Sequence, residues 1–406
     1  RGVGAFAEWL HPSTRAKDGE HHERKLHIEN FGPIKNADIT LRDLNISVGP
    51  QASGKSLFWQ LLKLLLDAPT IRDEFHRFNI DWGKDIKGFL SLYFGEGMEP
   101  LSGPDTVIQL DGQTRSLDKL FERRKGNGER VEDMFYVPAQ RVMALRDGLT
   151  RTFLEFRSGD PYVVRDFSDK LHRLVQTEFA KAEKLFPQAN RLNGHLRKLV
   201  DDAFFRGFSL ELSRDSTYQK KLVLKREAVQ LPFMAWSAGQ REFSPLLLGL
   251  YWLMPAGKVS RRDNLKWVVI EEPEMGLHPQ AISAFMALVL ELLRRGYRVC
   301  LSTHSPHVLD VVWALQTLKT PGGTEKDVLR LLGMPSNPAM KAIASSALEK
   351  TISVQYFKPG IGAVDISPLD PGSDRADVAG WGGLTEFSAS IGDIVAEVVA
   401  RQGGAK

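Results

Sequence analysis

The chain has 406 residues, of which 42% are hydrophobic and 26% are charged, and its net charge is +4. These values are ordinary for a soluble globular protein with two domains, or with one large domain and an insertion. The single cysteine, Cys300, excludes an internal disulfide framework and an all-cysteine metal site. No secretory signal is visible, and the most apolar stretch, residues 245–256, is shorter than the roughly 20 residues that span a bilayer. We therefore expect a cytoplasmic protein without a membrane partner.

The first half of the chain predicts a β-rich start followed by a helical lobe. Residues 1–24 are mostly polar and are expected to form a flexible tail. Strands are predicted at residues 26–31, 37–41, 44–48, 86–94, 105–110 and 134–137, with a helix at 57–66. Apolar residues at helical spacing predict a helical lobe over residues 151–200, namely Phe167, Leu171, Leu174, Val175 and Phe179. Residues 208–212 and 221–224 predict a hairpin.

The second half alternates buried strands with helices. Strands are predicted at 266–270, 297–302 and 352–357, and helices at 279–295, 326–332 and 388–401. Continuous apolar strands separated by helices are typical of a largely parallel sheet covered on both faces. We expect five segments: a tail (1–24), a first α/β lobe (25–150), a helical lobe with a hairpin (151–232), a second α/β lobe (233–320) and a C-terminal α+β extension (321–406).

One stretch between a predicted strand and a predicted helix fits the phosphate-loop spacing G-x-x-x-x-G-K-[ST]. It consists of Gly49, Pro50, Gln51, Ala52, Ser53, Gly54, Lys55 and Ser56. Its glycines allow a tight turn whose N–H groups point at phosphate oxygens, at the N-terminus of a helix. Lys55 would reach the β- and γ-phosphates, and the Ser56 hydroxyl would ligate Mg²⁺. The stretch therefore predicts a bound nucleoside triphosphate.

Polar residues at the ends of later strands suit nucleotide hydrolysis. Glu271 and Glu272 follow a buried strand, where the first would hold Mg²⁺ and the second would orient or deprotonate the attacking water. His304 follows the next buried strand and could contact the γ-phosphate. The alternatives are a solvated strand end for the carboxylates and a structural role for the histidine. Ser237 to Gln240 form a turn at a helix start, a weak anion-binding signal by itself.

The order of these motifs resembles a known group. The chain reads GPQASGKS, WSAGQ, VVIEEPEMGLHP and STHS, which is similar to the ABC-type ATPase heads of the RecF, SMC and OLD group. It is close to the stand-alone "AAA family ATPase" members found with bacterial defence genes. The resemblance covers about residues 25–312 and, more faintly, the C-terminal part, and it implies that 25–150 and 233–320 are the two lobes of the ATPase. It implies ATP and Mg²⁺ as cofactors, and an α/β fold: an ABC-type P-loop NTPase head with a mostly parallel sheet flanked by helices, an antiparallel N-terminal β part and an inserted helical lobe.

The resemblance also assigns roles, residue by residue. Residues 49–56 become the Walker A loop, Glu271 and Glu272 the Walker B pair, 275–279 the D-loop and His304 the switch histidine. The signature motif would be Ser237, Ala238, Gly239 and Gln240. Gln140 matches the position of the Q-loop, which lies near the nucleotide and its metal ion. The chain departs from the pattern in having Glu271 for Asp, Gln51 and Ala52 for Asn and Gly, and Ala238 for Gly.

The group's mechanism implies that two heads pair head-to-tail around ATP and gate a separate effector, a nuclease or a toxin, in DNA-linked or anti-phage defence. An alternative is a nucleotide-stabilised scaffold that holds such an effector inactive with little turnover. A transporter ATPase subunit is a further alternative. DNA is a candidate partner through the basic residues of 123–125, 191–198 and 220–226, which could equally form a solvated face. The acidic residues of 365–377 are too loosely spaced for a Toprim nuclease set, so we assign no nuclease to this chain.

Overall fold

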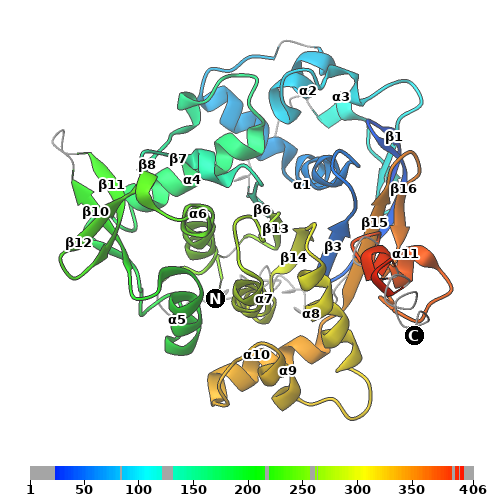
Figure 1. Cartoon of the computed structure of the whole chain (residues 1–406). Helices are drawn as coiled ribbons and strands as arrows, with labels where there is room; N and C mark the ends of the chain where they lie inside the picture. Colours follow the sequence, from blue (N-terminus) through cyan, green and yellow to red (C-terminus); the bar gives the residue numbers. More distant parts are fainter. Residues whose placement is uncertain are drawn as a thin grey trace, which may run out of the picture.

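The computed structural model describes residues 23–82, 85–120, 131–214, 219–256, 261–262, 264–385, 389–392 and 394–396. These residues form a ten-stranded sheet flanked by helices, and a four-stranded sheet that lies to one side of it (Figure 1). The predicted N-terminal tail lies outside the described residues except for Glu23 and Arg24, and Arg24 already begins the first strand. Half of the residues of the helix predicted at 388–401 also lie outside them, and the described ones, 389–392 and 394–396, are helical.

The centre of the large sheet consists of short apolar strands that run parallel. Their order is β15-β3-β14-β13-β6. Their bounds are Leu44–Val48 (β3), Met134–Val137 (β6), Trp267–Glu271 (β13), Arg298–Ser302 (β14) and Ile352–Lys358 (β15). All five had been expected from their apolar runs, and the mostly parallel sheet is confirmed. Because parallel strands share one carboxyl edge, the motifs that follow β3, β13 and β14 meet at that edge.

Five further strands continue the sheet beyond β15. They are β1 (Arg24–Phe31), β2 (Ile34–Leu41), β4 (Val107–Leu110), β5 (Gln113–Thr114) and β16 (Gly362–Asp365). Their pairings are antiparallel except the parallel one between β16 and β2. The predicted antiparallel N-terminal β part is thus present. The C-terminal strands β15 and β16 lie between it and β3, so they join the two halves of the sheet.

Helices cover both faces of the sheet, and the strand residues alternate between two apolar cores. Val268 and Ile270 of β13 pack in one core with α6 (Ala238–Leu253), α7 (Pro279–Arg294), α8 (Pro306–Thr317) and α10 (Pro338–Glu349). Trp267 and Val269 pack in the other with α1 (Lys55–Arg77) and α2 (Ile86–Phe94). This period-two alternation explains why every residue of β13 is buried.

The strand predicted at residues 86–94 is wrong, because this segment is helix α2. Its buried residues are Phe89, Leu90, Tyr93 and Phe94, which share one helical face. The Asp85 side chain caps the helix by accepting a hydrogen bond from the Lys87 amide at 3.1 Å. The short apolar run fits a strand and a helix equally well, and the cap decides between them.

The lobe predicted at residues 151–232 combines helices with a small sheet. Its helices include α4 (Tyr162–Gln176), α5 (Gly194–Val200) and the π-helix Asp201–Phe205. The predicted hairpin is confirmed as β10 (Ser209–Arg214) and β11 (Lys220–Arg226), and β12 (Val229–Pro232) pairs with β11. The segment expected to be wholly helical also contains β9 (Lys184–Phe186), which pairs with β10.

Shorter elements connect these parts. They are α3 (Leu117–Leu120), β7 (Leu145–Arg146), β8 (Leu149–Thr150), α9 (Glu325–Leu331), α11 (Ala376–Ala379) and the 3-10 helices Glu99–Leu101, Arg141–Ala144, Phe153–Glu155 and Phe233–Ala235. In the part of the chain that the structure describes, no helix is both long and apolar enough to cross a membrane.

Candidate functional site

The phosphate loop, residues 49–56, connects β3 to the N-terminus of α1, as its spacing predicts. Gly49 has φ +140°, and a Cβ at this position would lie 2.5 Å from the Phe357 carbonyl oxygen on β15. Gly54 has φ +101°, and a Cβ there would lie 2.6 Å from Ile34 Cγ1. Both glycines are therefore required by backbone conformation and by close packing.

Lys55 is folded back over this loop. Its Nζ donates hydrogen bonds to the carbonyl oxygens of Gly49 at 2.8 Å and Pro50 at 2.7 Å. Burial lowers the pKa of Lys55 to about 8, although the nearby carboxylates of Glu272, Glu271 and Glu274 act in the opposite direction. Lys55 Nζ also donates to Ser53 Oγ at 3.4 Å. An ammonium held by these neutral oxygens in a buried loop is suited to exchange them for phosphate oxygens.

Glu271 ends β13 in a buried position. Its Oε2 accepts a hydrogen bond from the Ala139 amide at 3.2 Å, whereas its Oε1 is buried without a well-formed hydrogen bond among the described residues. Burial raises the pKa of Glu271, and the neighbouring hydroxyls of Ser56 and Tyr136 partly offset that effect. A buried free carboxylate oxygen beside the Ser56 hydroxyl fits the hard oxygen ligands that Mg²⁺ prefers. Glu271 and Ser56 are therefore the residues that would hold the ion.

Glu272 lies next to the predicted switch histidine. Its Oε1 is 3.5 Å from His304 Nε2, and a hydrogen bond from His304 lowers the pKa of the Glu272 carboxyl group. Its backbone is left-handed, with φ 42°, and its amide donates to the Ser302 carbonyl oxygen at 2.7 Å. The structure thus brings together Lys55, Glu271, Glu272 and His304, which the sequence analysis selected from separate strand ends.

The signature residues, Ser237 to Gln240, form a separate turn at the start of α6. Ser237 caps α6: its Oγ accepts from the Gln240 amide at 3.3 Å, and its own amide donates to Gln240 Oε1 at 3.0 Å. Ser237 and Ala238 are exposed. A Cβ on Gly239 would lie 2.8 Å from the Gly276 carbonyl oxygen, so this turn packs on the 275–279 segment. No hydrogen bond or ion pair among the described residues joins 237–240 to the phosphate loop.

Gln140, expected near the nucleotide and the metal ion, is exposed and precedes the 3-10 helix Arg141–Ala144. Its side chain forms no hydrogen bond with another described residue. The structure therefore does not join Gln140 to Ser56 or Glu271, and its role stays a prediction.

Two residues of the site were not identified from the sequence. Glu274 accepts hydrogen bonds at Oε1 from Thr303 Oγ1 at 2.9 Å and from the His304 amide at 2.6 Å, so it ties the turn after β13 to the turn after β14. Arg141 is fully buried and donates to the carbonyl oxygens of Glu271 and Glu272. The available signals were a third glutamate close behind Glu271 and an arginine four residues after the end of the buried strand β6.

Residues 45–310 match the family AAA_21, described as "AAA domain, putative AbiEii toxin, Type IV TA system". The chain belongs to this family. The AAA_21 protein is 22% identical over 331 residues to an "OLD nuclease" of Thermus scotoductus, a match that covers 71% of this chain and 60% of the relative. The chain thus spans less than two thirds of the length of that relative.

Solved structures with a similar chain path include an SMC head bound to the C-terminal winged-helix domain of ScpA (12% identity, TM-score 0.39, covering 84% of this chain and 96% of the other). Another is the dimeric ABC transporter cassette MJ0796 (13% identity, TM-score 0.31, covering 70% and 89%). The AAA_21 match and the P-loop geometry make this protein an ABC-like ATPase of the RecF, SMC and OLD type.

Proposed function

We propose that this AAA_21 protein binds ATP with Mg²⁺ at residues 49–56 and hydrolyses it between two copies paired head-to-tail. The observation that carries the proposal is the position of Glu272, which is held against His304 at the strand edge that also carries the Lys55 loop. A carboxylate with a lowered pKa is ionised at neutral pH, so it can accept a proton from an attacking water.

The other residues of the site have complementary tasks. The Lys55 ammonium would bind phosphate oxygens in place of the Gly49 and Pro50 carbonyl oxygens. Ser56 and Glu271 would hold Mg²⁺, which when bound neutralises charge on the transferring phosphoryl group. His304 orients Glu272, and Glu274 fixes the backbone of His304 at 2.6 Å.

The surface around Ser237 supports pairing with a second copy. The signature turn is exposed and makes no bond to the phosphate loop of its own chain. Large apolar side chains are exposed close to it in sequence or in space: Met234 is 69% exposed, and Met275 beside Gly276 is 36% exposed. A second copy that placed its phosphate loop against this turn would cover both methionines and complete its own nucleotide site.

The proposed output is control of a separate toxin or nuclease in anti-phage defence. The family description names a putative toxin of a toxin–antitoxin system, and the curated relative is named as a nuclease. The alternative is a scaffold that holds such an effector inactive with little turnover. Glu271 favours that alternative because it is one methylene longer than the usual aspartate, and because burial raises its pKa, which opposes metal binding.

DNA is a second proposed partner, through the lobe between the ATPase segments. Residues 181–227 contain eleven Lys and Arg against six Asp and Glu, a net charge of +5, whereas the whole chain carries +4. A groove of about 900 Å³ in this lobe is lined by Lys184, Arg197, Lys198, Lys225 and Arg226 among others. Because Glu211 lies within 4 Å of Lys184 and Lys225, part of this charge is already paired. Binding of duplex DNA that weakens steeply with salt would support this contact.

The main proposal is tested by measuring phosphate release and self-association in parallel. Both are measured with ATP and Mg²⁺, and again after EDTA is added. We expect metal-dependent turnover and an ATP-dependent shift from monomer to dimer in sedimentation. An ATP-stable dimer without phosphate release would favour the scaffold, and a protein that does not bind ATP would contradict both functions.

A further inference from the structure

A single buried arginine joins the two halves of the proposed site. Arg141 Nη1 donates to the Glu271 carbonyl oxygen at 2.9 Å, and Nη2 donates to the Glu272 carbonyl oxygen at 3.0 Å. On its other side, Nε donates to the Glu242 carbonyl oxygen at 3.2 Å, and Nη2 lies 3.2 Å from Glu242 Oε2. Glu242 lies on α6, the helix that Ser237 caps. The guanidinium therefore spans from the signature helix to the peptide that carries Glu272.

Arg141 and Glu242 each depend on the charge of the other. The Arg141 side chain is fully buried and that of Glu242 is 15% exposed. Burial lowers the pKa of Arg141 and raises the pKa of Glu242, and in both cases the partner charge is the first effect that opposes it. Removing one member would leave the other as a poorly solvated charge. A guanidinium is also a planar, rigid fork, so it cannot follow a shift of α6 without changing its bonds to the two carbonyl oxygens.

Glu272 is sensitive to such a shift. Its left-handed backbone, at φ 42°, is unfavourable for a glutamate and persists because both of its peptide groups are bonded. The amide is held by the Ser302 carbonyl oxygen at 2.7 Å and the carbonyl oxygen by Arg141. Movement of Arg141 would therefore move the backbone that aims the Glu272 carboxylate at the water.

We propose that Arg141 and Glu242 couple nucleotide contact at Ser237–Gln240 to the placement of Glu272, so that Arg141 is a positioning residue for hydrolysis. This inference rests on the proposed function, because it requires a nucleotide on the signature turn. In each chain, the ATP held by the partner copy would contact the Ser237 end of α6. Arg141 would pass the effect of that contact to Glu272, which acts on the ATP held by its own chain.

The test compares Glu242→Gln and Arg141→Lys with the wild-type protein in ATP binding, steady-state turnover and thermal unfolding. Glu242→Gln keeps the shape of the side chain and removes its charge, and Arg141→Lys keeps the charge and removes the fork. We expect kcat to fall about ten-fold or more in both variants, with the Kd for ATP within about two-fold of wild type, because small misplacements of reacting groups are costly.

Glu291→Gln is the matched control. Glu291 is also a buried helical glutamate, and it pairs with Arg294 and Arg295 at 2.7 Å on α7, where it contacts neither Glu271 nor Glu272. We expect this variant to unfold at a lower temperature than the wild-type protein. At assay temperatures where it is folded, we expect it to keep the wild-type kcat.

A double variant separates coupling from stability. Ala238→Arg obstructs the signature turn, and adding Glu242→Gln should lower its kcat little further if the two residues act on one path. Wild-type kcat in Glu242→Gln and Arg141→Lys, losses that match the Glu291→Gln control, or additive losses in the double variant would overturn the inference. Absence of turnover in the wild-type protein would instead contradict the proposed function itself.

Discussion

At the scale of single residues, the site depends on the exact surroundings of a few charged groups. Lys55 donates to carbonyl oxygens of its own loop, and Glu271 Oε1 is buried without a well-formed hydrogen bond among the described residues. His304 lowers the pKa of the Glu272 carboxyl group. Each residue is therefore expected to fail in a different way when it is changed, which allows binding to be separated from chemistry.

Lys55→Ala and Glu272→Gln should separate these two steps. Loss of the Lys55 ammonium removes the cation that would bind phosphate, so we expect ATP binding to be lost. Glu272→Gln keeps the phosphate loop but removes the proton acceptor, so we expect ATP to bind while turnover falls about a hundred-fold or more. Nucleotide binding by fluorescence and phosphate release would measure both effects. Hydrolysis by Glu272→Gln at the wild-type rate would refute the role given to this residue.

The sequence identified the site residues that belong to spaced motifs, and it missed those that act through the backbone. Lys55, Glu271 and His304 follow apolar strands, so their position could be predicted. Arg141 and Glu274 bond mainly to peptide groups of distant segments. Such contacts depend on which strands are neighbours, and the local sequence does not contain that information.

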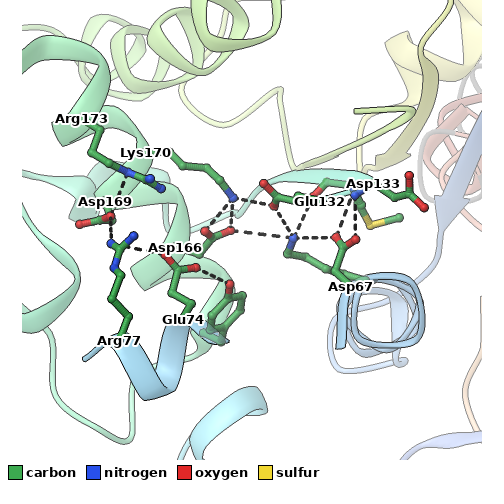
Figure 2. Close-up of polar contacts among 12 residues, drawn as sticks. Asp67, Glu74, Arg77, Glu132, Asp133, Asp166, Asp169, Lys170 and Arg173 are labelled. Carbon is green, nitrogen blue, oxygen red and sulfur yellow. Dashed lines mark hydrogen bonds and ion pairs between the residues drawn. The ribbon is translucent and has the colours of Figure 1, made fainter. Parts of the chain in front are cut away.

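At the scale of elements, a buried ionic network holds α4 against the phosphate-loop helix α1 (Figure 2). Lys63 of α1 lies 3.1 Å from Asp67 and 2.8 Å from Glu132, and Lys170 of α4 lies 2.6 Å from both Glu132 and Asp166. These five groups comprise three carboxylates and two ammonium groups, so full ionisation would leave an unbalanced buried negative charge. The pKa of Asp166 is raised to about 7, because the effect of burial outweighs the opposing effect of the Lys170 and Lys63 charges.

The network predicts a pH dependence of stability. Because the folded pKa of Asp166 lies above its unfolded value, the folded state binds the proton more tightly, and stability should fall as pH rises from about 4 to about 7. Asp166→Asn cannot ionise, so it should show a flatter slope in this range. The denaturant midpoint of unfolding, measured at several pH values for both proteins, would give the two slopes.

Asp169→Asn is the control for this experiment. Asp169 lies on the same helix and pairs with Arg77 and Arg173 at the edge of the network. We expect this variant to keep the wild-type slope while its midpoint falls. A wild-type slope in Asp166→Asn would mean that this carboxyl group is not the one that holds the proton.

Element types followed from the sequence where a segment had a clear period or a clear cap. The apolar runs of β3, β13 and β14 left no alternative to buried strands. Residues 86–94 were assigned wrongly because a nine-residue apolar run is ambiguous without its Asp85 cap. The strand β9 was missed because it has three residues and gains its pairing only from β10.

At the scale of the whole molecule, the sheet order explains why the C-terminal part belongs with the nucleotide site. β15 pairs with β3 (Figure 1), and it places the Phe357 carbonyl oxygen against Gly49. The sequence predicted this strand but not its position, because the pairing joins residues about 300 positions apart. The proposed head-to-tail pairing of two copies would likewise belong to the whole molecule, because it would bring the phosphate loop of one copy to the signature turn of the other.

Mixing two inactive variants tests that claim most directly. Lys55→Ala lacks the phosphate-binding lysine, and Ala238→Arg blocks the signature turn, so each variant alone should hydrolyse ATP poorly. In a head-to-tail dimer of the two variants, one site contains the intact Lys55 of one copy and the intact turn of the other. Random pairing repairs about a quarter of the sites. Because the Glu272 of each repaired site belongs to the copy whose turn is blocked, the coupling through Arg141 should lower the rate of that site about ten-fold, so we expect a few per cent of the wild-type turnover per chain, above that of either variant alone. A mixture that stays as inactive as its components, at concentrations where the wild type is dimeric and active, would contradict the shared site.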